Sequence, residues 1–185
     1  MGLLDRAKDA FREKTRDKIF MALKRMRVPA ELAESGRFEE NLKCGFGVHS
    51  LGIIDIGEGP VRWINVRIDL NEINWVDYAV PDESLGRHER EIMIQAHFEK
   101  RLLGLGKVVD LVWRGEDAGL GVVKRLNGDG PLKKTLMRTG ADDFTITAHD
   151  KPGCWLISVA YTAPPDKKLW GCYRTIAEHL LSERA

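Results

Sequence analysis

The feature that most constrains the fold is a run of alternating apolar and polar residues between Phe46 and Val80. Successive side chains of a β-strand point to opposite faces of a sheet, so this alternation predicts half-buried strands. We expect strands in FGVHSLGIIDI (46–56), VRWINVRID (61–69) and INWVDYAV (73–80). The GEGP tetrapeptide between the first two strands is typical of a turn. The sequence therefore predicts a hairpin followed by a third strand.

A second hairpin is predicted near the C-terminus. DDFTITAHD (142–150) and CWLISVAYT (154–162) flank a turn at residues 151–153, whose sequence is Lys-Pro-Gly. KVVDLVWRG (107–115) predicts a further strand upstream of this hairpin. Since two hairpin blocks are each followed by a helical pattern, the sequence favours an antiparallel sheet with helices packed against it.

Helices are predicted from apolar residues three and four apart and from capping residues. The predicted helices are 3–27, a short one within 30–42, 84–103, 118–127 capped by Asp117, 131–140, and one capped by Asp166 that ends near Ser182. The order of elements predicts an α+β fold with a long N-terminal amphipathic helix. We expect residues 1–28 to form this docking helix and residues 30–185 to form a single α+β domain.

The N-terminal helix carries one apolar stripe and a basic polar side. Leu4, Phe11, Ile19 and Met26 are the large residues of the stripe. Residues 1–27 hold nine Lys or Arg and four Asp or Glu, a net charge of +5, whereas residues 31–91 hold six and thirteen, a net charge of −7. Opposite charges favour docking of this helix on its own domain or on a partner. Acidic residues recur every four positions in the helix, so membrane association through residues 1–27 is the minority alternative.

One face of the first hairpin is a candidate binding surface. If Val48, Ile54, Ile64 and Val66 face the core, the opposite face is a mixture of aromatic, aliphatic and charged residues. We predict binding residues at His49, Leu51, Ile53, Trp63, Asn65, Arg67, Trp75 and Asp77. Such a face needs a cover. Three covers are considered: the N-terminal helix, a protein partner with Trp63 and Arg67 as anchors, and a small ligand held by Arg67 and His49.

Motifs for chemistry are weak in this chain. His88 and His97 are nine residues apart, so a single helix cannot direct both to one metal ion. Gly119 and Gly121 lack the third glycine of a dinucleotide-binding turn, and acidic residues precede them. No serine lies in a nucleophile-elbow motif. We therefore predict no metal site and no cofactor, and the sequence defines no catalytic residues.

Three cysteines, Cys44, Cys154 and Cys172, have neither disulfide-framework nor zinc spacing, and we expect them to be reduced, buried thiols. A net charge of +1 argues against a nucleic-acid binder. Because no apolar run approaches the length of a membrane span and no secretory signal is evident, we expect a cytoplasmic protein.

Together these patterns predict a non-catalytic protein-interaction module, a homodimer or a subunit of a larger assembly. The alternative is a small-ligand-binding protein or small enzyme with a pocket on the second face of the first hairpin. That pocket would use His49, Arg67, Asp77 and His88.

Overall fold

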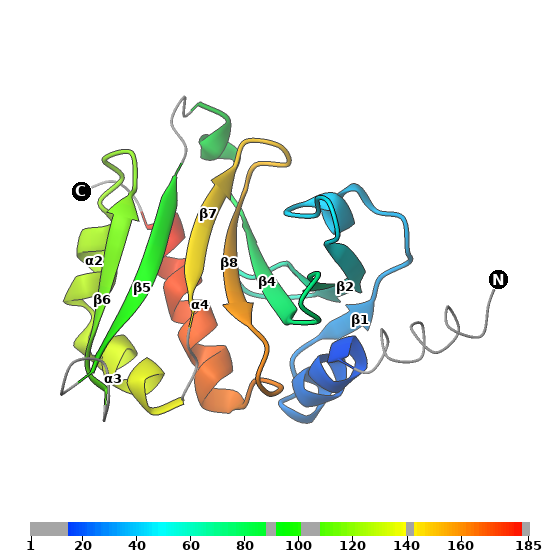
Figure 1. The fold of residues 1–185 in the computed structure, drawn as a ribbon, viewed down its shortest axis with the longest axis horizontal. Helices are drawn as coiled ribbons and strands as arrows, with labels where there is room; N and C mark the ends of the chain where they lie inside the picture. The colour runs from blue at the N-terminus through cyan, green and yellow to red at the C-terminus, as the bar shows by residue number, and fades with distance from the viewer. Residues whose placement is uncertain (1–14, 88–91, 101–107, 140–142, 183–185) are drawn as a thin grey trace.

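The computed structural model describes residues 15–87, 92–100, 108–139 and 143–182. Its centre is one eight-stranded sheet in the order β1-β2-β3-β4-β8-β7-β5-β6, and every neighbouring pair is antiparallel (Figure 1). The strands are β1 (Ala30–Leu32), β2 (His49–Ile56), β3 (Trp63–Ile68), β4 (Asn74–Pro81), β5 (Met93–Lys100), β6 (Val108–Glu116), β7 (Thr145–His149) and β8 (Cys154–Ala160). The predicted α+β class with an antiparallel sheet is confirmed.

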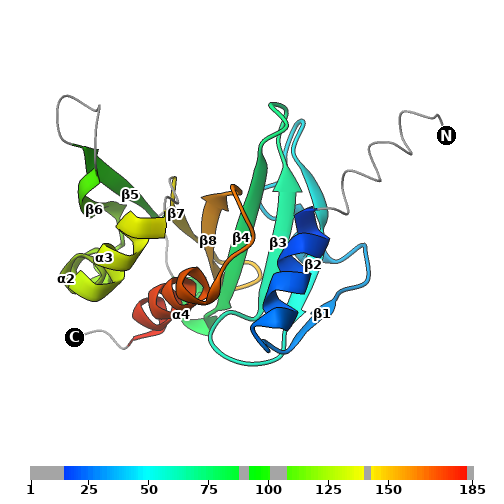
Figure 2. The ribbon, with the colours of Figure 1, turned by 90° about the horizontal axis from the view of Figure 1, so that it is seen from below.

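Helices cover one face of this sheet (Figure 2). They are the helix over residues 15–25, α2 (Val122–Gly128), α3 (Gly130–Thr139) and α4 (Lys167–Leu181). Two short 3-10 helices, η1 (Phe38–Asn41) and η2 (Glu83–Arg87), lie in connections between strands. The cap predicted at Asp166 is confirmed, since its carboxylate accepts a hydrogen bond from Leu169 N at 2.8 Å. The cap predicted at Asp117 is wrong, because α2 begins at Val122 and Gly121 is its N-cap residue, although the Asp117 carboxylate accepts a hydrogen bond from Val123 N at 3.0 Å.

The main core is built on a row of buried side chains that crosses six strands. Each member is the cross-strand partner of the next, in the order Ile54, Ile64, Tyr78, Ile157, Ile146 and Ile94. From α4, Tyr173 stacks on Tyr78 with ring centroids 3.9 Å apart. At the centre of the sheet, β4 pairs with β8, a strand far from it in the sequence. In this pair Val80 lies opposite Trp155. Cross-strand apolar pairs with burial on one face are the main source of stability in such a sheet.

The helix predicted over 84–103 is wrong. Residues 83–87 form the 3-10 helix η2, and β5 begins at Met93. Along β5 the burial alternates, because Ile94 is buried while Met93 and Gln95 are exposed. The apolar pattern of this stretch is therefore that of a strand, with a period of two, over residues 93–100. Residues 88–91, with His88, and 101–107 lie outside the described residues.

The short helix predicted within 30–42 is also wrong. Residues 30–32 instead form the edge strand β1, which pairs with β2 through Ala30–Ile56 and Leu32–Ile54. Only the four residues of η1 are helical in this stretch. Pairing with an existing strand outweighs the weak helix propensity of so short a segment.

The N-terminal helix is confirmed as helical over residues 15–25, and it ends before Pro29 as predicted. Arg27 has a φ of 61°, and Val28 N donates to Leu23 O, which closes the last turn. Ile19 and Leu23 are fully buried in the main core beside Leu51 and Ile54. The predicted docking residues Leu4 and Phe11 lie outside the described residues, and Met26 is partly buried against the core.

Candidate functional site

The face of the sheet opposite the main core brings together most of the predicted binding residues. Strand pairing aligns Ile53, Asn65 and Asp77 in one row and Arg67 with Trp75 in the next. Two predictions of position are wrong. A bulge between Ser50 and Gly52 turns Leu51 into the main core, and His49 is an exposed residue that pairs with Ile68.

This face is covered by the chain itself, through residues 33–44, here called the covering segment. Leu42, with Ala33 beside it, packs in a second apolar cluster that includes Ile53, Trp63 and Leu156. The helix of residues 15–25, one of the three covers considered, belongs to the main core on the other face and does not cover this one. Trp63 is thus buried inside the molecule, and it does not present a free anchor.

A buried ion pair lies under the edge of this cover. Arg67 donates from Nε to Asp77 Oδ2 at 2.6 Å and from Nη2 to Asp77 Oδ1 at 3.1 Å, and both residues are buried. The guanidinium also lies over the Trp75 ring, 5.6 Å from its centroid. The planar guanidinium of Arg67 binds both carboxylate oxygens of Asp77, so the two opposite charges are paired. The ion pair links β3 to β4.

Polar side chains tie the covering segment to the sheet. Asn65 Nδ2 donates to the backbone oxygen of Glu39, while Asn65 Oδ1 accepts a hydrogen bond from Ser50 Oγ at 2.7 Å. Arg37 bridges to Asp55 at 2.6 Å and to Glu39 at 2.9 Å. Both the amide nitrogen and the amide oxygen of Asn65 are therefore hydrogen-bonded within the protein.

The least ordinary member of the cluster is Lys43, which sequence reasoning missed. Its Nζ donates to Ser158 Oγ at 2.8 Å, and Ser158 is the cross-strand partner of Asp77. Burial lowers the pKa of the Lys43 amine; the charge of Asp77 opposes this shift and that of Arg67 adds to it. Lys43 lies in the connection between the helix predicted within 30–42 and the strand predicted from Phe46, and a lone lysine there carries no sequence signal of such a position.

His149 and the three cysteines, of which Cys172 lies on α4 in the main core, are also shifted toward their neutral forms. The pKa of His149 is lowered by burial and by the charge of Lys43. Burial raises the pKa of Cys44, and it raises that of Cys154 to about 12 and that of Cys172 to about 11. These thiols are free of disulfides, and Cys44 Sγ donates to the backbone oxygen of Glu40. They are therefore protonated and weakly nucleophilic near neutral pH.

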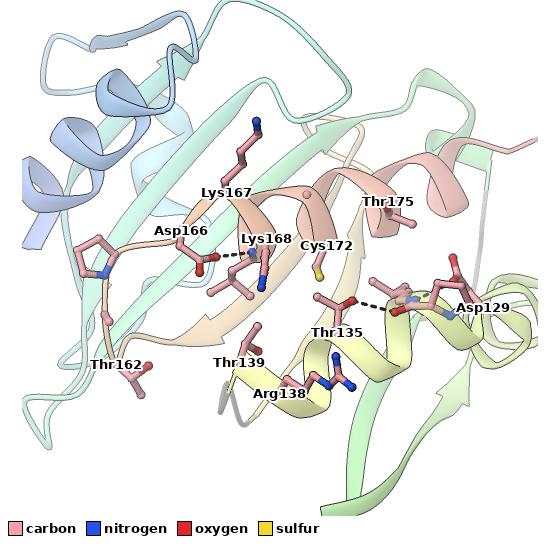
Figure 3. Close-up of a pocket in the computed structure, with 16 residues that line it drawn as sticks. Asp129, Thr135, Arg138, Thr139, Thr162, Asp166, Lys167, Lys168, Cys172 and Thr175 are labelled. Atoms are coloured by element: carbon pink, nitrogen blue, oxygen red, sulfur yellow. Dashed lines mark hydrogen bonds between the residues drawn. The ribbon is translucent and has the colours of Figure 1, made fainter.

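A groove of about 1020 Å³ lies between α3 and α4 (Figure 3). Three of its oxygen-bearing side chains are engaged within the fold. Asp166 caps α4, Thr135 Oγ1 donates to Pro131 O, and Asp129 accepts from Leu132 N and contacts His179 Nε2 at 2.8 Å. Figure 3 shows Lys167 pointing away from the groove. The lining thus presents no arrangement of acid, base and nucleophile among the described residues.

Neither a metal site nor a dinucleotide turn is formed by the parts of the chain that the structure describes. No group of three or more His, Cys, Asp or Glu residues in those parts could hold a metal ion. The Glu116 and Asp117 carboxylates already accept hydrogen bonds from Ala118 N and Gly119 N. Backbone amides at this turn are therefore occupied by the chain's own carboxylates.

Comparison of the chain with models of protein families, with curated proteins and with solved structures found no significant match. None of the helices in the described ranges combines the length and the apolar content that crossing a bilayer requires.

Proposed function

We propose that the chain is a non-catalytic, cytoplasmic protein-interaction module that acts as a homodimer or as a subunit of a larger assembly. The observation that carries this proposal is an exposed group of large apolar residues, here called the apolar tip. It consists of Phe46, Leu70 and Ile73, whose exposed fractions are 96%, 67% and 44%. Contiguous apolar side chains in solvent are typical of interaction sites.

The apolar tip is held in shape by the chain around it. A Cβ on Gly47 would lie 2.2 Å from the Leu70 side chain, so Leu70 packs directly on the backbone next to Phe46. The Asp69 carboxylate accepts hydrogen bonds from Asn71 N and Ile73 N, which fixes the β3–β4 turn. A preformed apolar surface loses little conformational entropy on binding.

The N-terminal helix supplies the second part of the proposal. The inner side of its described portion, with Ile19, is already docked on the main core. We propose that the helix continues over residues 3–27 as a long amphipathic element and that Leu4 and Phe11 extend the docking surface. We also propose that the two predicted hairpins, near residues 46–69 and 142–162, form the rigid sheet that supports this docking surface. Membrane attachment through residues 1–27 remains the weaker alternative, since acidic residues recur along the helix.

The test compares wild type with Phe46→Ser/Leu70→Ser by light scattering coupled to size exclusion and by pull-down. We expect the wild type to self-associate or to retain a partner, and we expect the variant to lose that association. Val109→Ser is the matched control, since Val109 is 52% exposed on β6, away from the apolar tip. A wild type that is strictly monomeric and recovers no partner would reject the proposal.

One observation favours a second candidate, a small-ligand-binding protein or small enzyme on the face predicted from the sequence. The Lys43 amine contacts the Ser158 hydroxyl at 2.8 Å, and an amine with a lowered pKa beside a serine is a known arrangement for activating the hydroxyl. Because Ser158 is buried, this candidate requires the covering segment to open, and it then predicts that a fluorophosphonate labels Ser158 in wild type and not in Lys43→Met. Absence of labelling at Ser158 in wild type would reject the enzyme form of this candidate.

A further inference from the structure

We infer that the partner of the apolar tip is a second copy of this chain, which contacts it with the outer surface of its helix over residues 15–25. This inference rests on the proposed function and adds the identity of the partner and the residues that it uses. Four features carry it: the composition of the outer helix surface, the charge around the apolar tip, the placement of the two surfaces, and the partly occupied edge strand β6.

The outer surface of the helix has the composition of an interface. Lys18, Met21 and Arg25 lie three and four residues apart, so they share the side opposite the buried Ile19 and Leu23. Met21 is 50% exposed, and Met is enriched at protein interfaces. Within the described ranges neither Lys18 nor Arg25 has an ion-pair partner, so both charges are available to another molecule.

The apolar tip has the complementary charge. Asp69 and Glu72 lie in the same β3–β4 turn as Leu70 and Ile73. A hydrogen bond from Trp75 Nε1 lowers the pKa of Asp69, which keeps that carboxylate ionised. Glu72 has no ion-pair partner among the residues that the structure describes. A partner for this surface therefore needs apolar side chains flanked by cations, and the helix surface provides both.

The two surfaces are placed for mutual contact between two copies. Figure 2 shows the helix of residues 15–25 along β2 and β3, the strands whose ends lead into the apolar tip. One two-fold axis can therefore bring the tip of each copy onto the helix of the other, with both contacts formed twice.

Pairing through the edge strand β6, another route to a dimer, is hindered in the middle of the strand. Asn127 of α2 donates to Trp113 O at 2.8 Å and accepts from Trp113 N at 2.9 Å. Asp110 in turn accepts from Leu111 N at 2.7 Å. These bonds occupy the N–H and C=O of Trp113 and the N–H of Leu111, which a second β6 would need for pairing.

A charge swap tests the inference. The first variant is Lys18→Glu/Arg25→Glu, and the second is Glu72→Lys. All three positions are exposed, and Glu72 keeps its left-handed backbone (φ 60°) with another L residue. We expect each variant alone to dimerise at least about tenfold more weakly than wild type, since like charges then meet at both contacts. An equimolar mixture should recover the dimer, because each helix surface again meets a tip of opposite charge. Sedimentation velocity over a concentration series measures all four samples, and circular dichroism checks that each variant is folded.

The possible results separate this inference from the proposed function. Variants that dimerise as the wild type does, or a mixture that stays monomeric, would overturn the inference. A monomeric wild type that loses a different bound protein on Phe46→Ser would also overturn it while supporting the proposed function. If Phe46→Ser changes neither self-association nor partner retention, both proposals fail.

Discussion

At the scale of single residues, the polar cluster under the covering segment separates two kinds of buried charge. Arg67 and Asp77 neutralise each other through two hydrogen bonds. Lys43 has only the Ser158 hydroxyl as a hydrogen-bond partner for its amine in the described chain. A paired buried charge is costly to break, whereas a buried charge without an opposite partner is itself a cost.

Removing the carboxylate of the pair tests the first statement. Asp77→Asn leaves the Arg67 guanidinium buried without its counter-charge, so we expect the free energy of unfolding to fall by about 3–5 kcal/mol. Urea unfolding followed by fluorescence measures the change. Glu99→Gln is the control, because its ion pair with Arg114 is exposed on both sides and should contribute no more than about 1 kcal/mol. Equal losses in the two variants would contradict this account of the pair.

Lys43→Met tests the second statement through pH. The unfolded chain keeps an ordinary lysine pKa of about 10.4, whereas burial lowers the pKa in the folded chain. Between these two values the unfolded state binds more protons, so the contribution of Lys43 to the free energy of unfolding becomes more favourable as pH rises. We therefore expect Lys43→Met to be more stable relative to wild type at pH 7 than at pH 10.

Urea unfolding at the two pH values checks this, with exposed Lys124→Met on α2 as the control. Two variants with the same pH dependence would contradict a buried, charged Lys43.

At the scale of elements, β6 is an edge strand, and a side chain forms hydrogen bonds with the backbone of one of its residues. Asn127 places its amide where the peptide group of a neighbouring strand would lie, on both the N–H and the C=O of Trp113. Edge strands with free backbone groups pair with other molecules, so this amide protects the sheet.

Asn127→Ala should therefore have two consequences. We expect a loss of about 1–3 kcal/mol in the free energy of unfolding, because two backbone groups lose their partner. We also expect concentration-dependent aggregation through β6, measured by static light scattering on warming. Lys124→Ala, an exposed change on the same helix, should show neither effect. A fully stable, non-aggregating Asn127→Ala would show that the amide does not protect the edge.

The same scale shows how much of the fold could be predicted from the sequence. β3 was predicted well, because Ile64 and Val66 alternate with Asn65 and Arg67, so its two faces differ in polarity even though both are buried. β5 was missed, because a short apolar run fits both helical and strand periods. The bulge that reversed Leu51 and the cover formed by residues 33–44 depend on tertiary contacts and leave no local pattern.

At the scale of the whole molecule, the helix of residues 15–25 shares one core with the sheet. Ile19 and Leu23 belong to the same buried cluster as Trp170 and Tyr173 of α4. Hydrophobic residues that are central to one cluster stabilise every element packed around it. The inner side of this helix is therefore a structural part of the fold, whereas its outer side is open to a partner.

Substitutions on the two sides of the helix should separate these roles. Ile19→Ala removes buried methyl groups, so we expect a loss of about 2–5 kcal/mol in the free energy of unfolding. Met21→Ala, on the exposed side, should change stability by no more than about 0.5 kcal/mol while weakening self-association. Urea unfolding and sedimentation velocity measure the two properties. A stability loss at Met21 equal to that at Ile19 would contradict the division into two sides.

The pairing of β4 with β8 has a consequence for the nascent chain. β4 (Asn74–Pro81) leaves the ribosome long before β8 (Cys154–Ala160), its permanent neighbour at the centre of the sheet. Until β8 is synthesised, Tyr78 and Val80 lack their cross-strand partners, and the core cannot form completely. Long-range pairings of this kind slow the search for the native arrangement. The interval between the synthesis of β4 and that of β8 is therefore the period when the newly made polypeptide most depends on protection from its neighbours.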